Sequence, residues 1–358
     1  MFLDRRFFED VPKAQLHIHM DGALPVEDIW AISQKHGINL PKLPEQTREA
    51  LEAYYRVDPD ERFDTVERFV GVFLAKFGPT IALTKTPAGM REAATAHVRD
   101  LARQKHVYAE TRFAPQYSVK KGFSLQDVIQ EALLGLNAGY LETGTLVKLI
   151  ISIGRECDQE TSLAVAKAAT EFQHNGVVAL DLACSEEEFP PELHIGAYRI
   201  ATEARLKRTV HAGEFPCDRD IRVKNMRTAL TDLRANGLGH AIPLAGEDEI
   251  LARVVRDGIR IESCPLSNLK TGTIKDIREL GLDKLLRAGV RVSLSTDDPL
   301  MFGTSMADVM QATCDAYGFG LEDVRTLTRN AVQSAFCNDE ERTRLYYEFM
   351  RRGFPLFA

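Results

Sequence analysis

Residues 14–22 read AQLHIHMDG, an apolar run that carries two histidines one residue apart and ends in Asp-Gly. The residues from 11 to 16 favour a β-strand, and on a strand residues i and i+2 point to the same face. His17 and His19 would therefore project side by side. Two neutral imidazoles that converge on one point form half of a transition-metal site. A pair of hydrogen-bonded core histidines is the alternative.

Seven further apolar runs follow, and helical segments with apolar residues three and four positions apart separate them. The predicted strands are Ala14–Met20, Val107–Phe113, Leu146–Ile153, Val177–Ala183, Thr209–Ala212, Leu238–His240, Ile259–Cys264 and Val292–Ser295. Eight alternations of strand and helix favour an α/β fold, a (β/α)8 TIM-type barrel that takes up residues 1–358 as a single domain. An open doubly wound sheet is the alternative, but no G-x-G-x-x-G fingerprint supports it.

One extra helical element precedes the second strand. Residues 64–77, DTVERFVGVFLAKF, place apolar side chains on one face of a helix. These side chains are Val66, Phe69, Val70, Phe73, Leu74 and Phe77. The face either packs against the core or forms a helical lid that keeps water from a pocket.

The composition describes an ordinary globular chain, with 44% hydrophobic and 27% charged residues. A net charge of -7 argues against nucleic acid or an anionic membrane surface as partner. Six cysteines without CxxC spacing predict neither a disulfide framework nor a Cys-rich zinc site. With no signal peptide or membrane span in the sequence, we expect a cytoplasmic protein; the pattern points to no particular oligomeric state.

Side chains capable of chemistry gather at the predicted C-terminal strand ends, where barrel enzymes build their sites. They are His17 and His19 after the first strand, His211 and Glu214 after the fifth, His240 after the sixth, and Asp297 and Asp298 after the eighth. Three histidines and one aspartate suit a divalent ion such as zinc and leave a position for water. The metal ligands predicted in this way are His17, His19, His211 and Asp297. Taken singly, each has a structural alternative as a helix cap or a core residue.

Two other features have structural interpretations. Glu110 and Arg112 share one face of the second strand and predict an ion pair inside the barrel. Cys264, in the segment CPLSN, has no separate base at a suggestive spacing, so packing is favoured over a nucleophilic role.

Seven motifs run in order along almost the whole chain, from residue 12 to NAVQSAF near the end. They are HIHMDGA, YAETRFAPQ, LDLA, TVHAGE, the His240 turn, CPLSN and STDDPLMF. By these motifs the chain resembles the adenosine deaminases of the amidohydrolase superfamily. STDDPLMF by itself also resembles AMP deaminases.

The resemblance implies a metal-dependent hydrolase barrel with one zinc ion per chain, which removes the 6-amino group of a purine by hydrolysis. By position, the four metal ligands predicted above would hold the zinc. Glu214 would be the acid near purine N1 and His240 the base that orients the water. Asp298 would meet purine N7. Asp21, with His19 beside it, matches the position that meets the ribose 5'-hydroxyl.

Two positions depart from the family pattern. Cys184 follows Asp-Leu-Ala where the family has glycine, whose backbone N–H meets purine N3. Cys184 keeps that N–H and adds a side chain beside the ligand. Ala241 follows His240 where glycine is also usual. Both departures bear on which purine fits.

The expected activity is deamination of adenosine and deoxyadenosine to inosine and deoxyinosine, in purine salvage. Adenine, AMP and N6-substituted adenosines are alternative substrates, and a deaminase-like protein that binds nucleosides without turnover is the alternative of another class. Asp21 favours a nucleoside, because a 5'-phosphate beside it would bring two like charges together. Asp21 as a helix cap is the competing interpretation. A cytidine-type zinc deaminase is excluded, because its H-x-E and P-C-x-x-C signatures are absent.

Overall fold

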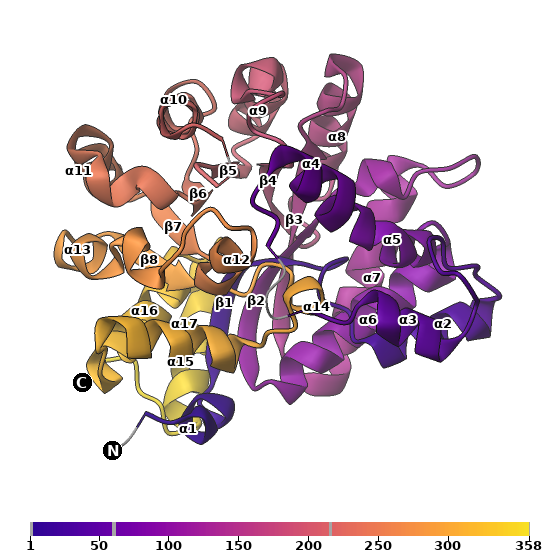
Figure 1. Ribbon diagram of the computed structural model, residues 1–358, viewed down its shortest axis with the longest axis horizontal. Helices are drawn as coiled ribbons and strands as arrows, with labels where there is room; N and C mark the ends of the chain where they lie inside the picture. Colours follow the sequence, from indigo (N-terminus) through magenta and orange to yellow (C-terminus); the bar gives the residue numbers. More distant parts are fainter. Residues whose placement is uncertain (1–2, 59–61, 215–216, 358) are drawn as a thin grey trace.

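The computed structural model describes residues 3–58, 62–214 and 217–357, and its strands form a (β/α)8 barrel (Figure 1). Eight parallel strands pair in chain order. They are β1 (Lys13–His19), β2 (His106–Phe113), β3 (Leu146–Gly154), β4 (Val177–Ala183), β5 (Lys207–Ala212), β6 (Gly237–His240), β7 (Arg260–Ser263) and β8 (Arg291–Leu294). The predicted barrel is confirmed, and the predicted strand bounds agree to within two residues.

Helices surround the strands and connect each to the next (Figure 1). The α-helices are α1 (Arg5–Asp10), α2 (Val26–His36), α3 (Arg48–Tyr54), α4 (Val66–Arg68), α5 (Gly78–Thr84), α6 (Pro87–Arg103), α7 (Leu125–Thr143), α8 (Gln159–Glu171), α9 (Ile195–Glu203), α10 (Arg219–Thr231), α11 (Asp248–Asp257), α12 (Pro265–Lys270), α13 (Leu282–Arg287), α14 (Pro299–Phe302), α15 (Met306–Tyr317), α16 (Leu321–Ser334) and α17 (Asp339–Arg351). Shorter turns are η1 (Phe69–Phe73), η2 (Leu74–Phe77), η3 (Pro115–Tyr117), η4 (Pro191–His194), η5 (Ile242–Gly246) and η6 (Ile277–Leu280).

Local sequence explains where these elements begin and end. In α7, Ser124 and Asp127 form a capping box at the start, and Gly144 ends the helix in the left-handed conformation at φ +76°. The strand β3 is buried along most of its length, as expected for a strand covered on one side by helices and on the other by the barrel interior. The barrel core therefore needs nearly continuous apolar runs, which is the pattern of the sequence.

The barrel closes between β8 and β1 through the residues predicted to bind metal. Ile18 and Asp297 form a parallel bridge. The His19 N–H donates to the Asp297 carbonyl at 2.9 Å, and the Asp297 N–H donates to the His17 carbonyl at 3.2 Å. The contacts that close the barrel therefore also place Asp297 beside His17 and His19.

The predicted helix over 64–77 is split into short pieces. The α-helical turn α4 passes into the π-helical η1 and then into the 3-10 turn η2. Phe69 and Phe73 are buried in a second apolar cluster beside the main core, Phe73 stacking on Phe302 with a centroid distance of 5.3 Å. Val70 is 40% exposed, and the Val66 side chain lies outside the described part. A π-helical segment is typical of a functional position.

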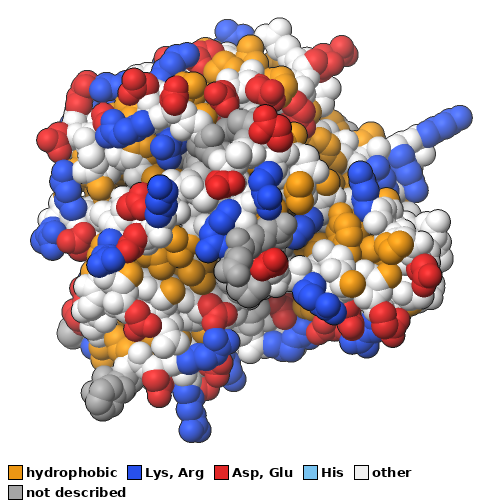
Figure 2. Space-filling model, viewed as in Figure 1, with side chains coloured by type: hydrophobic (Ala, Val, Ile, Leu, Met, Phe, Trp, Pro, Cys, Tyr) orange, Lys and Arg blue, Asp and Glu red, His pale blue; other side chains and the backbone are white. Residues whose placement is uncertain are grey.

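On the face seen in Figure 2, acidic and basic side chains are interspersed, with smaller apolar areas between them. None of the helices in the described ranges has the length and apolar character needed to span a membrane.

Candidate active site

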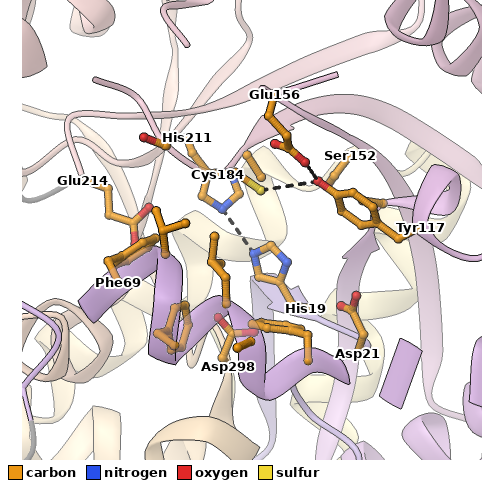
Figure 3. A pocket seen from close by; sticks show the side chains of 18 of the residues that line it. His19, Asp21, Phe69, Tyr117, Ser152, Glu156, Cys184, His211, Glu214 and Asp298 are labelled. Carbon is orange, nitrogen blue, oxygen red and sulfur yellow. Dashed lines mark hydrogen bonds between the residues drawn. The ribbon is translucent and has the colours of Figure 1, made fainter. Parts of the chain in front are cut away.

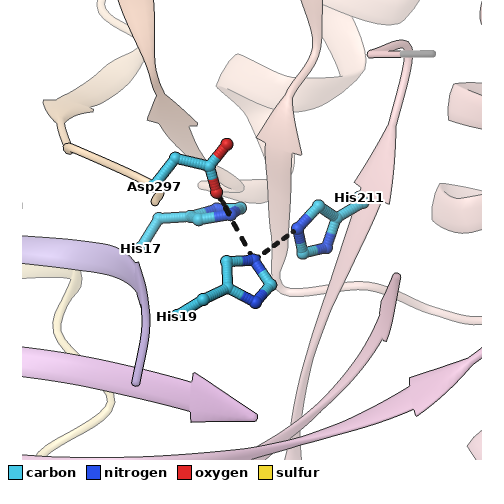
Figure 4. Close-up of side chains that lie close together, drawn as sticks. All are labelled: His17, His19, His211 and Asp297. Atoms are coloured by element: carbon cyan, nitrogen blue, oxygen red, sulfur yellow. Dashed lines mark hydrogen bonds and ion pairs between the residues drawn. The ribbon is translucent and has the colours of Figure 1, made fainter. Parts of the chain in front are cut away.

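Four of the predicted side chains converge at the carboxyl ends of β1, β5 and β8 (Figure 4). Potential ligand atoms of His17, His19, His211 and Asp297 all lie within 4.8 Å of one another. Asp297 Oδ1 lies 3.1 Å from His17 Nε2 and 3.4 Å from His19 Nε2. The Nε2 atoms of His19 and His211 are 3.2 Å apart. The structure therefore brings the predicted ligand set together.

Buried carboxylates and a hydroxyl orient these side chains from behind. Glu262 Oε2 pairs with His17 Nδ1 at 2.9 Å, and Asp181 Oδ1 pairs with His211 Nδ1 at 3.1 Å. Each contact leaves the Nε2 of its histidine turned toward the cluster. Ligating histidines are commonly held by such outer hydrogen bonds. Ser267 Oγ donates to Asp297 Oδ2 at 2.7 Å and fixes the carboxylate in the same way.

The predicted ion pair between Glu110 and Arg112 is wrong, because each residue pairs with other partners. Arg112 lies 2.7 Å from Glu262 and 3.4 Å from Asp181, whereas Glu110 lies 2.6 Å from Arg260. Neighbours two apart on one strand share a face, but the interior of a barrel also brings in residues from strands distant in sequence. Arg112 therefore supports the two carboxylates that orient His17 and His211.

Glu214 and His240 lie against the cluster. His240 Nε2 is 3.5 Å from Glu214 Oε2 and 3.9 Å from Asp297 Oδ2, and its Nδ1 pairs with the Asn268 amide at 3.0 Å. Burial, and next the charge of Asp297, raise the pKa of Glu214 well above its usual range. Burial holds the pKa of His240 well below its usual range. These shifts favour a protonated Glu214 carboxyl opposite a neutral His240 imidazole.

Cys264 has closer neighbours than the sequence suggested. It is fully buried, and its Sγ lies within 4.8 Å of ligand atoms of His17, His240 and Asp297. Burial raises the pKa of its thiol well above the usual range. The predicted packing role agrees with this burial, although the residue packs against the site itself.

A pocket of about 460 Å³ opens onto the cluster (Figure 3). Its apolar wall comes from the segment between β1 and β2, through Phe69, Val70, Phe73, Leu74 and Phe77. Glu214 lies on one side of the His19–His211 pair, and Tyr117 and Glu156 lie on the other. The segment predicted as core or lid packs in the second apolar cluster and also forms a wall of the pocket, since Phe69 and Phe73 are buried and line it.

Asp21 and Asp298 both line the pocket and are buried. Burial raises the pKa of Asp21 to about 7 and that of Asp298 well above its usual range. Pro25, not Asp21, occupies the N-cap of α2, so the capping interpretation of Asp21 is wrong. Asp298 precedes α14 but makes no side-chain cap bond. Their Oδ1 atoms have no hydrogen-bond partner in the described ranges.

The two departures from the family glycines take a backbone conformation that favours glycine. Cys184 has φ +81° and Ala241 has φ +50°. Side chains rarely adopt this left-handed region, and such strain concentrates at functional sites. Cys184 lines the pocket, with its Sγ 3.8 Å from the Tyr117 hydroxyl.

Sequence reasoning missed the residues that hold the site from outside. They are Arg112 as a supporting residue, Asp181, Glu186, Glu262, Ser267 and Asn268. Ser267 and Asn268 lie inside the motif CPLSN, and Asp181 lies in LDLA, so position near a strand end was the available signal. Glu262 interrupts an apolar strand, which is a second signal for a buried functional charge.

A barrel that gathers histidines and acids at its strand ends is typical of the amidohydrolase-type deaminases. The family model described as "Adenosine deaminase" matches residues 12–351. The chain therefore belongs to the adenosine deaminase family.

One relative is an adenosine deaminase of Mycobacterium ulcerans, 31% identical, with 97% of this chain and 95% of the relative covered. An adenine deaminase from Arthrobacter aurescens has a similar structure, with a TM-score of 0.80, 24% identity, and 95% and 98% of the two chains covered. An N6-methyl-AMP deaminase from Arabidopsis thaliana gives a TM-score of 0.78, 22% identity, and coverage of 97% and 98%. These two likenesses show the barrel fold.

Proposed function

We propose that the chain is a zinc-dependent hydrolase that deaminates adenosine and 2'-deoxyadenosine, with one zinc ion per chain. The observation that carries the proposal is the convergence of three histidines and Asp297 beside Glu214 and His240, at the floor of a pocket. The mycobacterial relative, named as an adenosine deaminase, supports this choice of reaction.

The residues fit a divalent cation. His17 Nε2 and Asp297 Oδ1 are buried 3.1 Å apart, and neither has a hydrogen-bond partner within the described chain. Two imidazole nitrogens also face each other at 3.2 Å. Buried polar atoms without partners are costly, and a shared cation would satisfy them together. Three nitrogens and one carboxylate oxygen suit zinc, so His17, His19, His211 and Asp297 would hold it.

A bound zinc ion would supply Lewis acidity and make water a usable nucleophile at neutral pH. The chain supplies the proton transfers. As the water oxygen adds to purine C6, His240 Nε2 takes the proton released and Glu214 gives a proton to N1. His240 then returns its proton to the amino group, the C6–N6 bond breaks and ammonia leaves, while the C6–OH proton passes to Glu214, which restores the acid and leaves the 6-oxo purine. Water and a nucleoside thus give ammonia and the 6-oxo nucleoside.

The remaining contacts would orient the purine. N7 is an acceptor, so a protonated, buried Asp298 can donate to it. The Cys184 N–H can donate to N3. Purine N9 lies at the opposite end of the ring system from N1. With N1 at Glu214, the sugar would therefore lie toward Asp21 and Tyr117, on the other side of the histidine pair.

The lining of the pocket favours a nucleoside over a nucleotide as the substrate. The described side chains that line it include Asp21, Glu156 and Glu188, and none of them is Lys or Arg. A 5'-phosphate would meet these carboxyl groups, and no Lys or Arg of the described lining would offset its charge. Free adenine would leave Asp21 without its partner. Adenine, AMP and N6-substituted adenosines remain the alternative substrates, and nucleoside binding without turnover remains the alternative of another class.

The six cysteines form no disulfide, which supports the proposed cytoplasmic location.

The test is metal analysis combined with a substrate panel. We expect about one zinc per chain, and activity that a strong chelator removes and zinc restores. Ultraviolet absorbance would follow adenosine, 2'-deoxyadenosine, adenine, AMP and N6-methyladenosine. Active enzyme without a transition metal would overturn the zinc assignment. A preference for adenine or AMP would overturn the substrate. No turnover of any panel member, together with tight adenosine binding, would favour the non-catalytic alternative.

A further inference from the structure

A buried glutamate ties together the two loops that carry Glu214 and Cys184. Glu186 is 1% exposed and follows β4. Its carboxylate accepts from the Gly213 N–H at 2.9 Å and from the Glu214 N–H at 2.6 Å. The Asn225 amide, on α10, donates to the same carboxylate at 3.2 Å. One side chain in the loop after β4 therefore holds the backbone of the loop after β5.

This link lies where the sheet gives little support. β4 and β5 pair only at Ala179–Lys207 and Leu180–Arg208, near the amino end of β5. By contrast, β5 and β6 pair over four successive residues that end at Ala212–His240. The carboxyl ends of β4 and β5 thus carry substrate-facing residues without a continuous backbone ladder between them. Hydrogen bonds to a charged acceptor are stronger than those between neutral groups. The Glu186 carboxylate can therefore replace the missing ladder as the link between the two loops.

We propose that Glu186 is a positioning residue that sets the Glu214 carboxyl relative to purine N1. The inference rests on the proposed function, which puts Glu214 at N1 and the Cys184 N–H at N3. These two ring atoms flank C2, so the separation of the two loops fixes how well both contacts are made at once. Glu186 lies two residues after Cys184 in sequence and bonds the backbone N–H of Glu214 itself.

A carboxylate is required because two N–H groups point at the same side chain. The substitution Glu186→Gln would keep one acceptor oxygen and turn an NH2 toward the other N–H. The substitution Glu186→Ala would leave both N–H groups without this acceptor. Displacements of about 1 Å in a catalytic group can cost on the order of a hundredfold in rate.

The test compares Glu186→Gln and Glu186→Ala with the matched control Glu187→Gln, an adjacent exposed glutamate. We expect Glu186→Ala to lose about ten- to a hundredfold in kcat with a smaller change in KM, because Glu214 acts mainly in the transition state. The kcat of Glu186→Gln should lie between those of Glu186→Ala and the parent, and the kcat of Glu187→Gln should equal that of the parent. Zinc content should stay constant, since Glu186 does not belong to the candidate ligand groups. Equal kcat in Glu186→Ala and the parent would overturn the proposal.

A double-mutant cycle separates positioning from general support of the fold. If Glu186 acts through Glu214, then Glu186→Ala should cost little further kcat in a Glu214→Gln background. A full, additive loss in that background would show that Glu186 acts otherwise. Amide hydrogen exchange gives a readout independent of substrate. Gly213 and Glu214 should exchange faster in Glu186→Ala than in the parent or in Glu187→Gln, and equal exchange would overturn the proposed link. If the parent deaminates no purine, the proposed function fails, while the exchange measurement still decides the link.

Discussion

Two groups of buried polar residues share the barrel interior and meet their electrostatic needs differently. The ion-pair network consists of Glu110, Arg112, Asp181, Arg260 and Glu262. The site cluster consists of His17, His19, His211, Glu214, His240 and Asp297. In the network, each arginine lies within 3.4 Å of two carboxylates. In the cluster, the ion-pair partners of Glu214 and Asp297 within the described chain are histidines alone.

The difference shows which group is complete without a ligand. A buried charge is tolerated when an opposite charge and hydrogen bonds compensate it. In the network every charged group faces an opposite charge of the chain, and Arg112 and Arg260 also donate hydrogen bonds to Glu262, so its charges are balanced without a ligand. The cluster has acceptor atoms that face one another, which is the arrangement a cation and a substrate would complete. Glu262 and Asp181 join the two groups, because each contacts Arg112 on one side and a site histidine on the other.

The largest expected effect on turnover comes from Glu214→Gln. The variant keeps a side chain of the same shape but cannot supply the proton to N1. We expect zinc content to be retained and turnover of adenosine to fall by on the order of a hundredfold or more, the usual scale for a general acid. Steady-state kinetics and elemental analysis check this. Near-normal turnover would remove Glu214 from the mechanism.

Arg112→Met probes the network with a residue of similar volume. It removes the cation shared by Asp181 and Glu262 and leaves buried carboxylates less compensated. We expect a loss of about 3–5 kcal/mol in the free energy of unfolding, and a fall in zinc affinity of about ten- to a hundredfold. Chemical denaturation and competition with a chelator measure the two effects. Arg91→Met, at an exposed ion pair with Glu131, is the control and should change neither. Unchanged zinc affinity in Arg112→Met would separate the network from the site.

The barrel and the cluster could be predicted because both depend on local pattern. Each strand is a short apolar run, and each predicted ligand lies near the carboxyl end of one. The partners of Arg112 could not be predicted in the same way. Glu110 is two residues away on the same strand, whereas Glu262 comes from β7 and Asp181 from β4. The register between distant strands decides that choice, and one strand's sequence does not contain it.

The split of residues 64–77 was likewise hidden. The apolar spacing predicted a continuous helix. The same spacing is also compatible with the α, π and 3-10 turns that the structure has, so the pattern cannot distinguish between them. Phe69 and Phe73 pack into the second apolar cluster, a tertiary contact that the spacing of apolar residues does not contain. The Glu186 link escaped for a related reason, since its partners are backbone N–H groups, which leave no trace in side-chain pattern.

Substitutions of Asp21 test whether this residue makes the pocket select nucleosides over nucleotides. We expect Asp21→Ala to lower kcat/KM for adenosine about tenfold, the scale of one hydrogen bond, and to lower that for AMP less. Asp21→Asn is the matched control, since it keeps an acceptor oxygen and loses the charge; it should retain most of the adenosine activity and improve the relative use of AMP. The ratio of the two kcat/KM values is the measurement. An unchanged ratio in both variants would show that Asp21 does not select the nucleoside.

A prediction about stability alone concerns His97, a buried histidine on α6 outside both groups. Neither ring nitrogen has a hydrogen-bond partner in the described chain, and burial lowers its pKa to about 3. In the unfolded chain the His97 side chain binds a proton below about pH 6.5, whereas in the folded chain it stays neutral down to about pH 3. His97 therefore costs stability as the pH falls through this window, by about 2 kcal/mol between pH 7 and pH 5. In His97→Leu the free energy of unfolding, measured in urea at both pH values, should fall by about 2 kcal/mol less than in the parent. The exposed His174 serves as the control, because His174→Leu should keep the parent's acid sensitivity. An equal fall in His97→Leu and the parent would mean that His97 is already protonated, or paired, in the folded chain.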